Sequence, residues 1–440
     1  MNYPSTQFLT RPSYVFSDDK AHTHADKFRG ILRYKPLRPS KIIAPQCLFI
    51  FDTADRDNAN RLYLALKNGI GSFPGIQQFV GIAVSRDKLD ALRLPSDLIR
   101  GGGAGLYSAV AHHLQNSAPK PDFVFVIGEQ KWKFQRPSPY AAIKAALVPF
   151  GVPSQVVSKE LLRADNQLQF AVPNIALASC VKLGGIPWLI HRPDATPAMV
   201  LGIGTTEVPE TPDSLRKKFL GFAFCILSNG LYLDMSFFGA AATYDEFLPN
   251  LRLGLQETLV RLANEGTSVS RLTVHVSHFE RRRTVDTIRD VLEESRNKNQ
   301  LSMPFEVLRL TQDSPFMVID PQHPGYVSME GTVVNLGPEH ALVVTEGRQE
   351  RAKWRGRKPV TLEVHREHAY PETMSFEESL HDTFRLCFVN WRAFNTISVP
   401  VSLSYAKLLS ERVADMATVE PQIVDQLRQQ LSLSRSPWFL

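Results

Sequence analysis

Short apolar runs alternate with amphipathic stretches through the first half of the chain. The apolar runs predict strands at residues 47–53, 80–85, 122–128 and 154–158. The stretches between and after them predict helices at residues 55–67, 105–115, 138–148 and 174–182. Apolar runs bounded by polar residues are typical of parallel strands that helices cover on both faces. The pattern therefore predicts an α/β fold, with a Rossmann-like domain at residues 41–195.

The second half combines a hairpin with further α/β units. Apolar runs at residues 219–227 and 231–238 flank Asn229-Gly230, a strong hairpin signal. Further strands are predicted at residues 198–205, 272–277, 305–310, 331–336, 341–345 and 360–365, and helices at 244–264, 284–295, 375–384 and 401–416. This order predicts an RNase H-like domain at residues 196–440. Residues 1–40 are polar without a clear period, which predicts an N-terminal arm or a partner-binding segment.

The length and composition fit a globular protein with more than one core. Its 440 residues exceed the size of one ordinary core, and 43% are hydrophobic and 21% charged. The apolar runs are too short to cross a bilayer, and residues 1–16 lack a signal-peptide pattern. We therefore expect a cytoplasmic protein without a membrane partner. The four cysteines form no CxxC pair, which predicts neither a zinc site nor a disulfide framework.

The charge of the chain favours a polyanionic partner, because the net charge is +6 and the isoelectric point is about 9.0. Basic residues also gather in short stretches, and such a run is as often a solvated loop as a contact with nucleic acid. On the second interpretation, the residues that line a nucleic-acid duplex are Lys217, Lys218, Arg281, Arg282, Arg283, Arg351, Lys353, Arg355, Arg357 and Lys358.

Four residues between positions 140 and 182 carry the most specific chemical signal. Tyr140 and Lys144 are four apart on a predicted helix, so both side chains project from one face. Gln155 follows a turn at the start of a predicted strand, and Lys182 precedes two glycines. Two cations, an amide and an aromatic ring could converge on one phosphate and its base. Any one of these residues alone would be ordinary on a helix face or in a loop.

The order of these residues resembles the MID domain of Argonaute proteins. The resemblance rests on Tyr140-x3-Lys144, Gly151-Val-Pro-Ser-Gln155 and Lys182-Leu-Gly-Gly-Ile-Pro-Trp188. In that family the matching Tyr, Lys, Gln and Lys bind the 5′-phosphate and first base of a guide strand, and Asn174 matches another position near the guide. The resemblance therefore implies that Tyr140, Lys144, Gln155, Asn174 and Lys182 hold the 5′ end of a guide.

The end of the chain is similar to the end of the PIWI domain in short prokaryotic and archaeal Argonautes. The similar segments are Asn390-Trp-Arg-Ala-Phe394 and Ser436-Pro-Trp-Phe-Leu440. In such proteins the C-terminal carboxylate enters the MID pocket and helps hold a divalent ion against the guide phosphate. The resemblance implies that the carboxylate of Leu440 is a ligand of Mg²⁺, which prefers oxygen ligands. Ala178 departs from the archaeal pattern, which has Gln at that position.

The carboxylates with which RNase H-like nucleases hold two metal ions are missing from the family positions. Gly204 stands where the first Asp belongs, and Ser277 and His278 stand where the second belongs. Lys407 stands at the last position of the tetrad. Glu207 lies near the first position, but one carboxylate on a loop is a weak metal site. We therefore expect no catalytic residue and no guided cleavage by this chain.

The two resemblances cover residues 45–440 and imply a short, catalytically inactive Argonaute with a MID and a PIWI domain. The expected function is recognition of invading plasmid or phage DNA through a 5′-phosphorylated guide RNA. Such chains resemble one half of a defence complex whose other half joins an APAZ domain to an effector, which is a sirtuin-like or TIR NADase or a nuclease. Target recognition would activate the effector of this heterodimer, or of a higher oligomer, and cause abortive infection.

Two other functions remain open from the sequence. The chain could act alone, as a homodimer that captures or bridges DNA. It could also be an active guided nuclease, which would require metal-dependent cleavage of a matched target by the purified chain. A neighbouring gene for an APAZ effector would favour the two-protein complex, whereas self-association without such a gene would favour the stand-alone protein.

Overall fold

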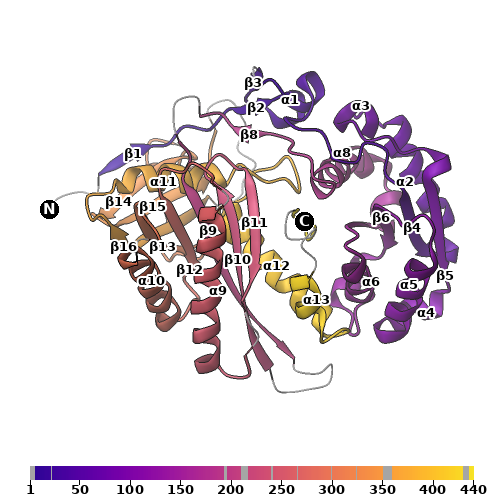
Figure 1. Ribbon diagram of the computed structural model, residues 1–440. Coiled ribbons are helices and arrows are strands. Elements are labelled where there is room, and N and C mark those ends of the chain that lie inside the picture. Colours follow the sequence, from indigo (N-terminus) through magenta and orange to yellow (C-terminus); the bar gives the residue numbers. More distant parts are fainter. Residues whose placement is uncertain are drawn as a thin grey trace.

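The structure of the protein is a computed structural model. It describes all residues except 1–4, 21, 193–195, 210–216, 239–240, 265, 299, 324, 350–358 and 430–435. Two lobes lie side by side, each built on one large sheet, and the C-terminus lies between them (Figure 1). We call the part built on the four-stranded sheet the first lobe and the part built on the nine-stranded sheet the second lobe. Among the described helices, none is both long and apolar enough to cross a membrane.

The first lobe is a parallel sheet with helices on both faces. Its strand order is β5-β4-β6-β7, where β4 is Cys47–Asp52, β5 is Leu89–Leu94, β6 is Phe123–Gly128 and β7 is Ser154–Ser158. Its helices are α2 (Arg56–Asn68), α3 (Ile76–Val80), α4 (Ser96–Gly101), α5 (Gly103–Asn116), α6 (Pro139–Leu147), α7 (Lys159–Arg163) and α8 (Asp165–Lys182). In β4, Phe49 and Phe51 join one core, whereas Leu48 and Ile50 join another. This burial on both faces explains the continuous apolar runs of the sequence.

One predicted strand of this lobe, at residues 80–85, is wrong. Val80 ends α3, and Gly81 follows it in the left-handed conformation with φ of 80°. Ile82 and Val84 are buried but belong to no strand. The strand that does form is β5, at the edge of the sheet, and most of its side chains are partly or fully exposed. It therefore lacks the apolar run on which the prediction relied.

The second lobe is a mixed sheet in the order β1-β14-β15-β16-β13-β12-β9-β10-β11. Strands β9, β12 and β13 are parallel, and the other pairs are antiparallel. The strands are β9 (Met199–Pro209), β10 (Lys217–Leu227), β11 (Tyr232–Phe237), β12 (Leu272–Ser277), β13 (Phe305–Thr311), β14 (Thr332–Gly337), β15 (His340–Glu346) and β16 (Val360–Tyr370). The helices are α9 (Tyr244–Asn264), α10 (Arg282–Asn297), α11 (Phe376–Leu386), α12 (Val401–Ala417) and α13 (Ile423–Gln429). The predicted hairpin at Asn229-Gly230 joins β10 to β11.

Helix α12 lies directly on strand β9, because two glycines of that strand leave room for its backbone. A Cβ atom at Gly202 would lie 2.1 Å from the carbonyl oxygen of Ser402, and one at Gly204 would lie 3.1 Å from that of Ala406. One hydrophobic core contains residues of α12 and also continues into the first lobe, so that Phe49 and Phe222 belong to the same buried cluster. The two lobes therefore share a core.

The N-terminal segment is folded against both lobes. Strand β1 (Thr6–Phe8) pairs with β14 at one edge of the nine-stranded sheet. Strands β2 (Tyr14–Phe16) and β3 (His22–His24) form a small sheet with β8 (Leu189–Ile190), and helix α1 (Lys27–Tyr34) follows. The segment at residues 1–40 is therefore structured over most of its length, and its binding of a partner stays a prediction.

Candidate functional site

A cavity of about 380 Å³ opens between the two lobes, and we call it the interlobe cavity. All six residues that the sequence assigns to the 5′ end of a guide line it: Tyr140, Lys144, Gln155, Asn174, Lys182 and Leu440. The first five come from α6, β7 and α8 of the first lobe. Ser138 begins α6 by accepting a hydrogen bond from the Ala141 amide at 3.3 Å, which fixes the helix that presents Tyr140 and Lys144.

The two lysines of the interlobe cavity meet at one carbonyl group. The Nζ atoms of Lys144 and Lys182 each donate to the Ser154 carbonyl oxygen at 2.8 Å, and Lys182 also donates to Oε1 of Gln155 at 2.8 Å. Burial, with Arg412 nearby, lowers the pKa of Lys144 to about 7. Burial and then the neighbouring Lys144 hold the pKa of Lys182 well below its usual range. An anion that entered the cavity would restore the positive charge of both lysines.

Two arginines of the second lobe, Arg392 and Arg412, complete the cationic lining. The guanidinium carbon of Arg412 lies 4.7 Å from the centre of the Tyr140 ring, which is a cation–π contact between α12 and α6. Sequence motifs of the first lobe did not mark either arginine, because both approach the cavity through tertiary structure. Arg392 lies inside the segment that resembles a PIWI ending, and that was the available signal for it.

Helix α8 presents one face to the cavity through Asn174, Ala178 and Lys182, which lie one turn apart. Oδ1 of Asn174 accepts a hydrogen bond from the Phe394 amide at 3.2 Å, so this residue also joins the lobes. Ala178 contributes only a methyl group to this face. The chemistry of this face therefore comes from Asn174 and Lys182.

The oxygen donors of the cavity limit how a metal ion could be held. Glu129 lines the cavity, but it is already paired with Lys131 at 2.6 Å and Lys159 at 2.5 Å. Leu440 also lines the cavity, and the terminal carboxylate expected on it is the other acidic group that the described lining residues could supply. One carboxylate together with phosphate oxygens and water is a donor set that suits Mg²⁺. The residues present therefore fit such an ion only when a phosphate is bound.

The sequence of this chain is similar to those of known proteins. Residues 123–418 match the family model described as Piwi domain. The chain belongs to the Piwi family. It is 22% identical to the protein argonaute of Cereibacter sphaeroides over 466 aligned positions, which cover 99% of this chain and 59% of that protein. It is 24% identical to the Piwi protein of Archaeoglobus fulgidus, over 68% of this chain and 71% of that protein.

Two solved structures have the same fold as this Piwi-family chain. One is Clostridium butyricum Argonaute bound to a guide DNA and a 19-mer target DNA, with a TM-score of 0.70, 15% identity, and coverage of 94% of this chain and 53% of that one. The other is Drosophila Piwi, with a TM-score of 0.68, 14% identity, and coverage of 99% and 56%. The predicted fold class is confirmed, with a Rossmann-like first lobe and an RNase H-like second lobe. The chain spans a little over half the length of these Argonaute and Piwi structures.

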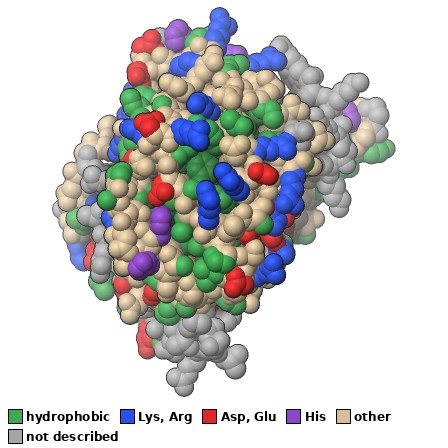
Figure 2. Space-filling view, turned by 90° about the vertical axis from the view of Figure 1, so that its right-hand side faces the viewer, with side chains coloured by type: hydrophobic (Ala, Val, Ile, Leu, Met, Phe, Trp, Pro, Cys, Tyr) green, Lys and Arg blue, Asp and Glu red, His purple; other side chains and the backbone are tan. Residues whose placement is uncertain are grey.

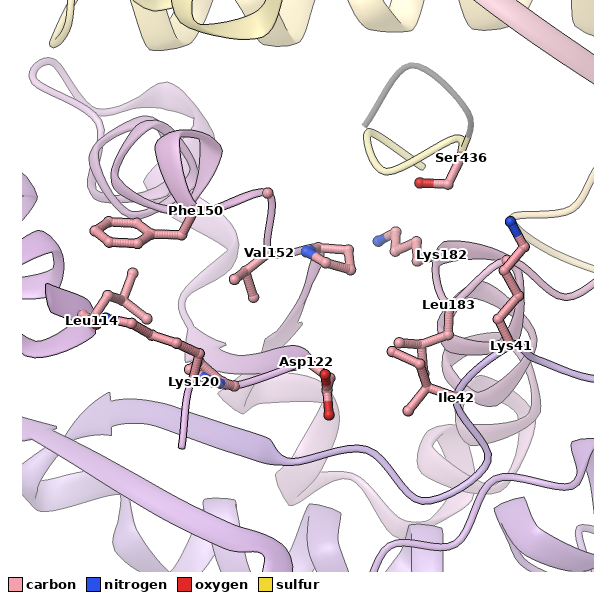
Figure 3. Close-up of a pocket in the computed structure, with 14 residues that line it drawn as sticks. Lys41, Ile42, Leu114, Lys120, Asp122, Phe150, Val152, Lys182, Leu183 and Ser436 are labelled. Carbon is pink, nitrogen blue, oxygen red and sulfur yellow. Dashed lines mark hydrogen bonds between the residues drawn. The ribbon is translucent and has the colours of Figure 1, made fainter. Parts of the chain in front are cut away.

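A second cavity, of about 620 Å³, lies on the other side of Lys182, and we call it the rear cavity. Lys41 and Ser436 lie at one side of it, and Phe150 and Leu114 lie at the opposite side (Figure 3). Because Lys182 lines both cavities, its side chain belongs to the wall between them. The rear cavity can serve as a control for the interlobe cavity, because the other lysines of the rear cavity do not line the interlobe cavity.

The four residues that stand at the expected tetrad positions also come together in the structure. Gly204, Ser277, His278 and Lys407 line one cavity of about 560 Å³, which we call the Gly204 cavity. Glu207 is not among its described lining residues. Three acidic residues that no sequence motif marked, Glu280, Asp313 and Glu346, do line it. In the described part of the chain, no group of three or more His, Cys, Asp or Glu side chains could hold a metal ion.

The basic residues expected along a duplex have mixed surroundings. Arg282 pairs with Glu367 at 2.9 Å, and Arg283 pairs with Asp245 at 2.5 Å. The guanidinium of Arg281 lies 4.2 Å from the centre of the Tyr244 ring. On the outer face of the first lobe, Lys and Arg side chains outnumber acidic ones around an apolar patch (Figure 2). Residues Arg351, Lys353, Arg355, Arg357 and Lys358 and the side chains of Lys217 and Lys218 lie outside the described part of the structure.

Proposed function

We propose that this chain binds the 5′-phosphorylated end of a guide RNA and uses the guide to recognise invading DNA. The observation that carries the proposal is the convergence of four basic side chains on one cavity beside the Tyr140 ring: Lys144, Lys182, Arg392 and Arg412. A terminal phosphate carries two negative charges and accepts several hydrogen bonds, so it matches this lining. The first base of the guide would lie against Tyr140.

The test compares guides with a 5′-phosphate and a 5′-hydroxyl. Wild-type protein should bind the phosphorylated guide more tightly, and a Lys144→Ala, Lys182→Ala double variant should lose this preference. Lys67→Ala, which removes an exposed lysine of α2, is the matched control and should keep it. Equal affinity of the wild-type protein for both guides would contradict the proposal.

A Mg²⁺ ion beside the phosphate, held partly by the carboxylate of Leu440, is a finer form of the same proposal. The ion would neutralise charge between the carboxylate and the phosphate. Chelation with EDTA should then weaken binding of the phosphorylated guide and leave the hydroxyl guide unchanged. Added residues after Leu440 should have the same effect, whereas residues added before Met1 should not. Phosphate-specific binding that neither change affects would exclude the ion.

The absence of target cleavage by this chain is a further part of the proposal. It is supported by Gly204, where an Asp side chain would press against the backbone of α12, and by Lys407 in place of a metal ligand. Purified protein with a guide and a matched target should leave the target intact in Mg²⁺ or Mn²⁺. If cleavage occurs, Glu280→Gln should be made first, because this carboxylate lines the same cavity.

The output of recognition then belongs to a second protein, which we propose to be an APAZ-domain effector with NADase or nuclease activity. Its activation by target-bound complex would cause abortive infection and so protect against plasmids or phages. The supporting argument is that a binder without cleavage needs another activity to have an effect. Purification from the native host should recover such a protein with guide RNA bound. Recovery of a homodimer without this protein would instead favour a stand-alone DNA-binding role.

A further inference from the structure

The N-terminal segment reaches the loop that carries Arg392 into the interlobe cavity. This loop joins α11 to α12. Arg392 is exposed, but the residues beside it are fixed: the Trp391 amide donates to the Tyr405 hydroxyl at 2.8 Å, and the Arg392 amide donates to Oδ1 of Asn390 at 3.1 Å. The second lobe therefore holds the backbone just before Arg392, and the residues just after it contact the N-terminal segment.

Phe394, two residues after Arg392, joins the loop to the first lobe and to the N-terminal segment. Its amide donates to Oδ1 of Asn174 at 3.2 Å, and its carbonyl oxygen accepts from Nζ of Lys27 at 3.3 Å. Its ring packs against those of Phe28 at 5.5 Å, Trp188 at 5.8 Å and Phe79 at 6.1 Å, measured between ring centres. Both polar backbone groups and the side chain of one residue are thus restrained, and α1 supplies Lys27 and Phe28.

Lys27 is an unusual residue at this place, because its side chain is buried with 5% exposure. Its Nζ atom lies 5.3 Å from the Tyr14 ring centre and 5.6 Å from that of Trp188. Burial, with Arg11 nearby, lowers the pKa of Lys27 to about 7, and its charged form is favoured by two aromatic faces, the Phe394 carbonyl and the carboxylates of Glu330 and Asp26. A Met or Leu at this position would fill the space without the cost of burial of an ammonium group, so core packing alone does not account for a lysine.

We propose that Lys27 and Phe28 are positioning residues for the guide pocket, which hold Phe394 and thereby direct Arg392 toward the 5′-phosphate. This inference rests on the proposed function, since it requires a phosphate at the interlobe cavity. It assigns to the N-terminal segment a role in guide binding, although no residue of that segment lines the cavity among those described. Binding of a partner to this segment would therefore also change the affinity of the pocket for the 5′-phosphorylated guide.

The experiment measures the ratio of the dissociation constants for hydroxyl and phosphorylated guides. Lys27→Met keeps the length of the side chain but removes the ammonium group, and it should lower this ratio about tenfold, the loss expected for a misplaced charged hydrogen bond. Arg33→Met removes a charge from an exposed position of the same helix and should leave the ratio unchanged. Lys27→Arg keeps a basic group at this position and should keep much of the wild-type ratio.

A double-mutant cycle separates positioning from general destabilisation. Combining Lys27→Met with Arg392→Gln should lower the ratio no further than Arg392→Gln alone, because both remove the same contact. Additive losses, or equal weakening of both guides, would overturn the inference. If Lys27→Met fails to fold, Phe28→Leu tests the same contact with a milder change, and an unchanged ratio would again overturn it. A wild-type protein without phosphate preference would instead refute the proposed function itself.

Discussion

The interlobe cavity and the Gly204 cavity are both lined by helix α12, yet their contents differ. At the interlobe cavity α12 contributes Arg412 to a set of four basic side chains, and the acidic side chain in the lining, Glu129, is paired elsewhere. At the Gly204 cavity it contributes Lys407 opposite three carboxylates that no common ligand geometry unites. Charges of one sign that converge on a point suit a phosphate, whereas mixed charges suit neither a phosphate nor a pair of metal ions. The interlobe cavity thus has a lining that suits a bound phosphate, whereas the mixed lining of the Gly204 cavity supports the proposal that this Piwi-family chain does not cleave a target.

The largest expected effect separates the interlobe cavity from the rear cavity. Lys182→Ala should weaken binding of a 5′-phosphorylated guide by about 3 kcal/mol, roughly a hundredfold, because it removes a buried cation and the partner of Gln155. Lys41→Ala, which alters the rear cavity alone, should change Kd less than about twofold, as is usual for an exposed charge. Fluorescence titration with both guides provides the measurement. Similar losses in both variants would show that the guide extends into the rear cavity, which Lys182 also lines.

The next effect concerns the contact between α12 and β9. Gly202→Ala should lower the free energy of unfolding by about 2–3 kcal/mol, because its Cβ would overlap the Ser402 carbonyl. Gly204→Ala should cost about 1 kcal/mol, since its nearest contacts are 3.0–3.1 Å away. Urea unfolding of the two variants checks the order. If Gly204→Ala were the more harmful change, the space beside the expected Asp position would be tighter than the structure indicates.

The pH dependence of guide binding tests the charge state of the lysines. Their pKa values are lowered in the empty pocket, to about 7 for Lys144, and a bound phosphate raises them, so binding takes up protons. Affinity for the phosphorylated guide should therefore fall as the pH rises from 7 to 9, by up to about tenfold per pH unit for each proton. The phosphate stays a dianion over this range. A 5′-hydroxyl guide is the control, and a parallel fall in its affinity would assign the titration to other groups.

The smallest effect concerns an ion pair at the edge of the same site. Oδ1 of Asp415 lies 3.5 Å from Nη2 of Arg136 in the first lobe, and Oδ2 of Asp415 lies 3.7 Å from Nη1 of Arg412. Asp415→Asn should reduce the free energy of unfolding by no more than about 1 kcal/mol, because Arg136 is largely exposed and water screens the pair. Guide affinity should change little, since the contact of Arg412 with Tyr140 remains. A tenfold loss in affinity would show that Asp415 holds Arg412 in its binding position.

Local sequence patterns were sufficient for most of the fold. Helix α9 and strands β7 and β12 have the predicted bounds, because their apolar spacing and flanking polar residues are unambiguous. Helix α8 begins at Asp165 rather than at residue 174, since Pro173 inside it resembles a helix start. Strand β5 was missed because this edge strand has few apolar residues, and the strands of the N-terminal segment were missed because each is only 3 residues long. Their pairing is decided by neighbours that the local sequence does not contain.

The sequence predicted those residues of the candidate site that lie close together along the chain, and it missed those that lie far apart. Tyr140, Lys144, Gln155 and Lys182 lie within 43 residues and come from two helices and a strand of one lobe, so their order could be compared with a family motif. Arg412 lies more than 200 residues away on a helix of the other lobe, and it reaches Tyr140 only because the lobes pack together. The same reason hid the contact between Lys27 and Phe394, which are 367 positions apart. Long-range contacts of this kind have no local signature.

The core that runs through both lobes has a consequence for how the protein responds to heat and to ligands. Phe49 of the first lobe and Phe222 of the second belong to one buried cluster, so neither lobe can open without exposing apolar surface of the other. We expect a single cooperative melting transition rather than two, and poor solubility of either lobe produced separately. Binding of a ligand in the interlobe cavity would raise the melting temperature of the whole molecule, because the two lobes are expected to unfold together.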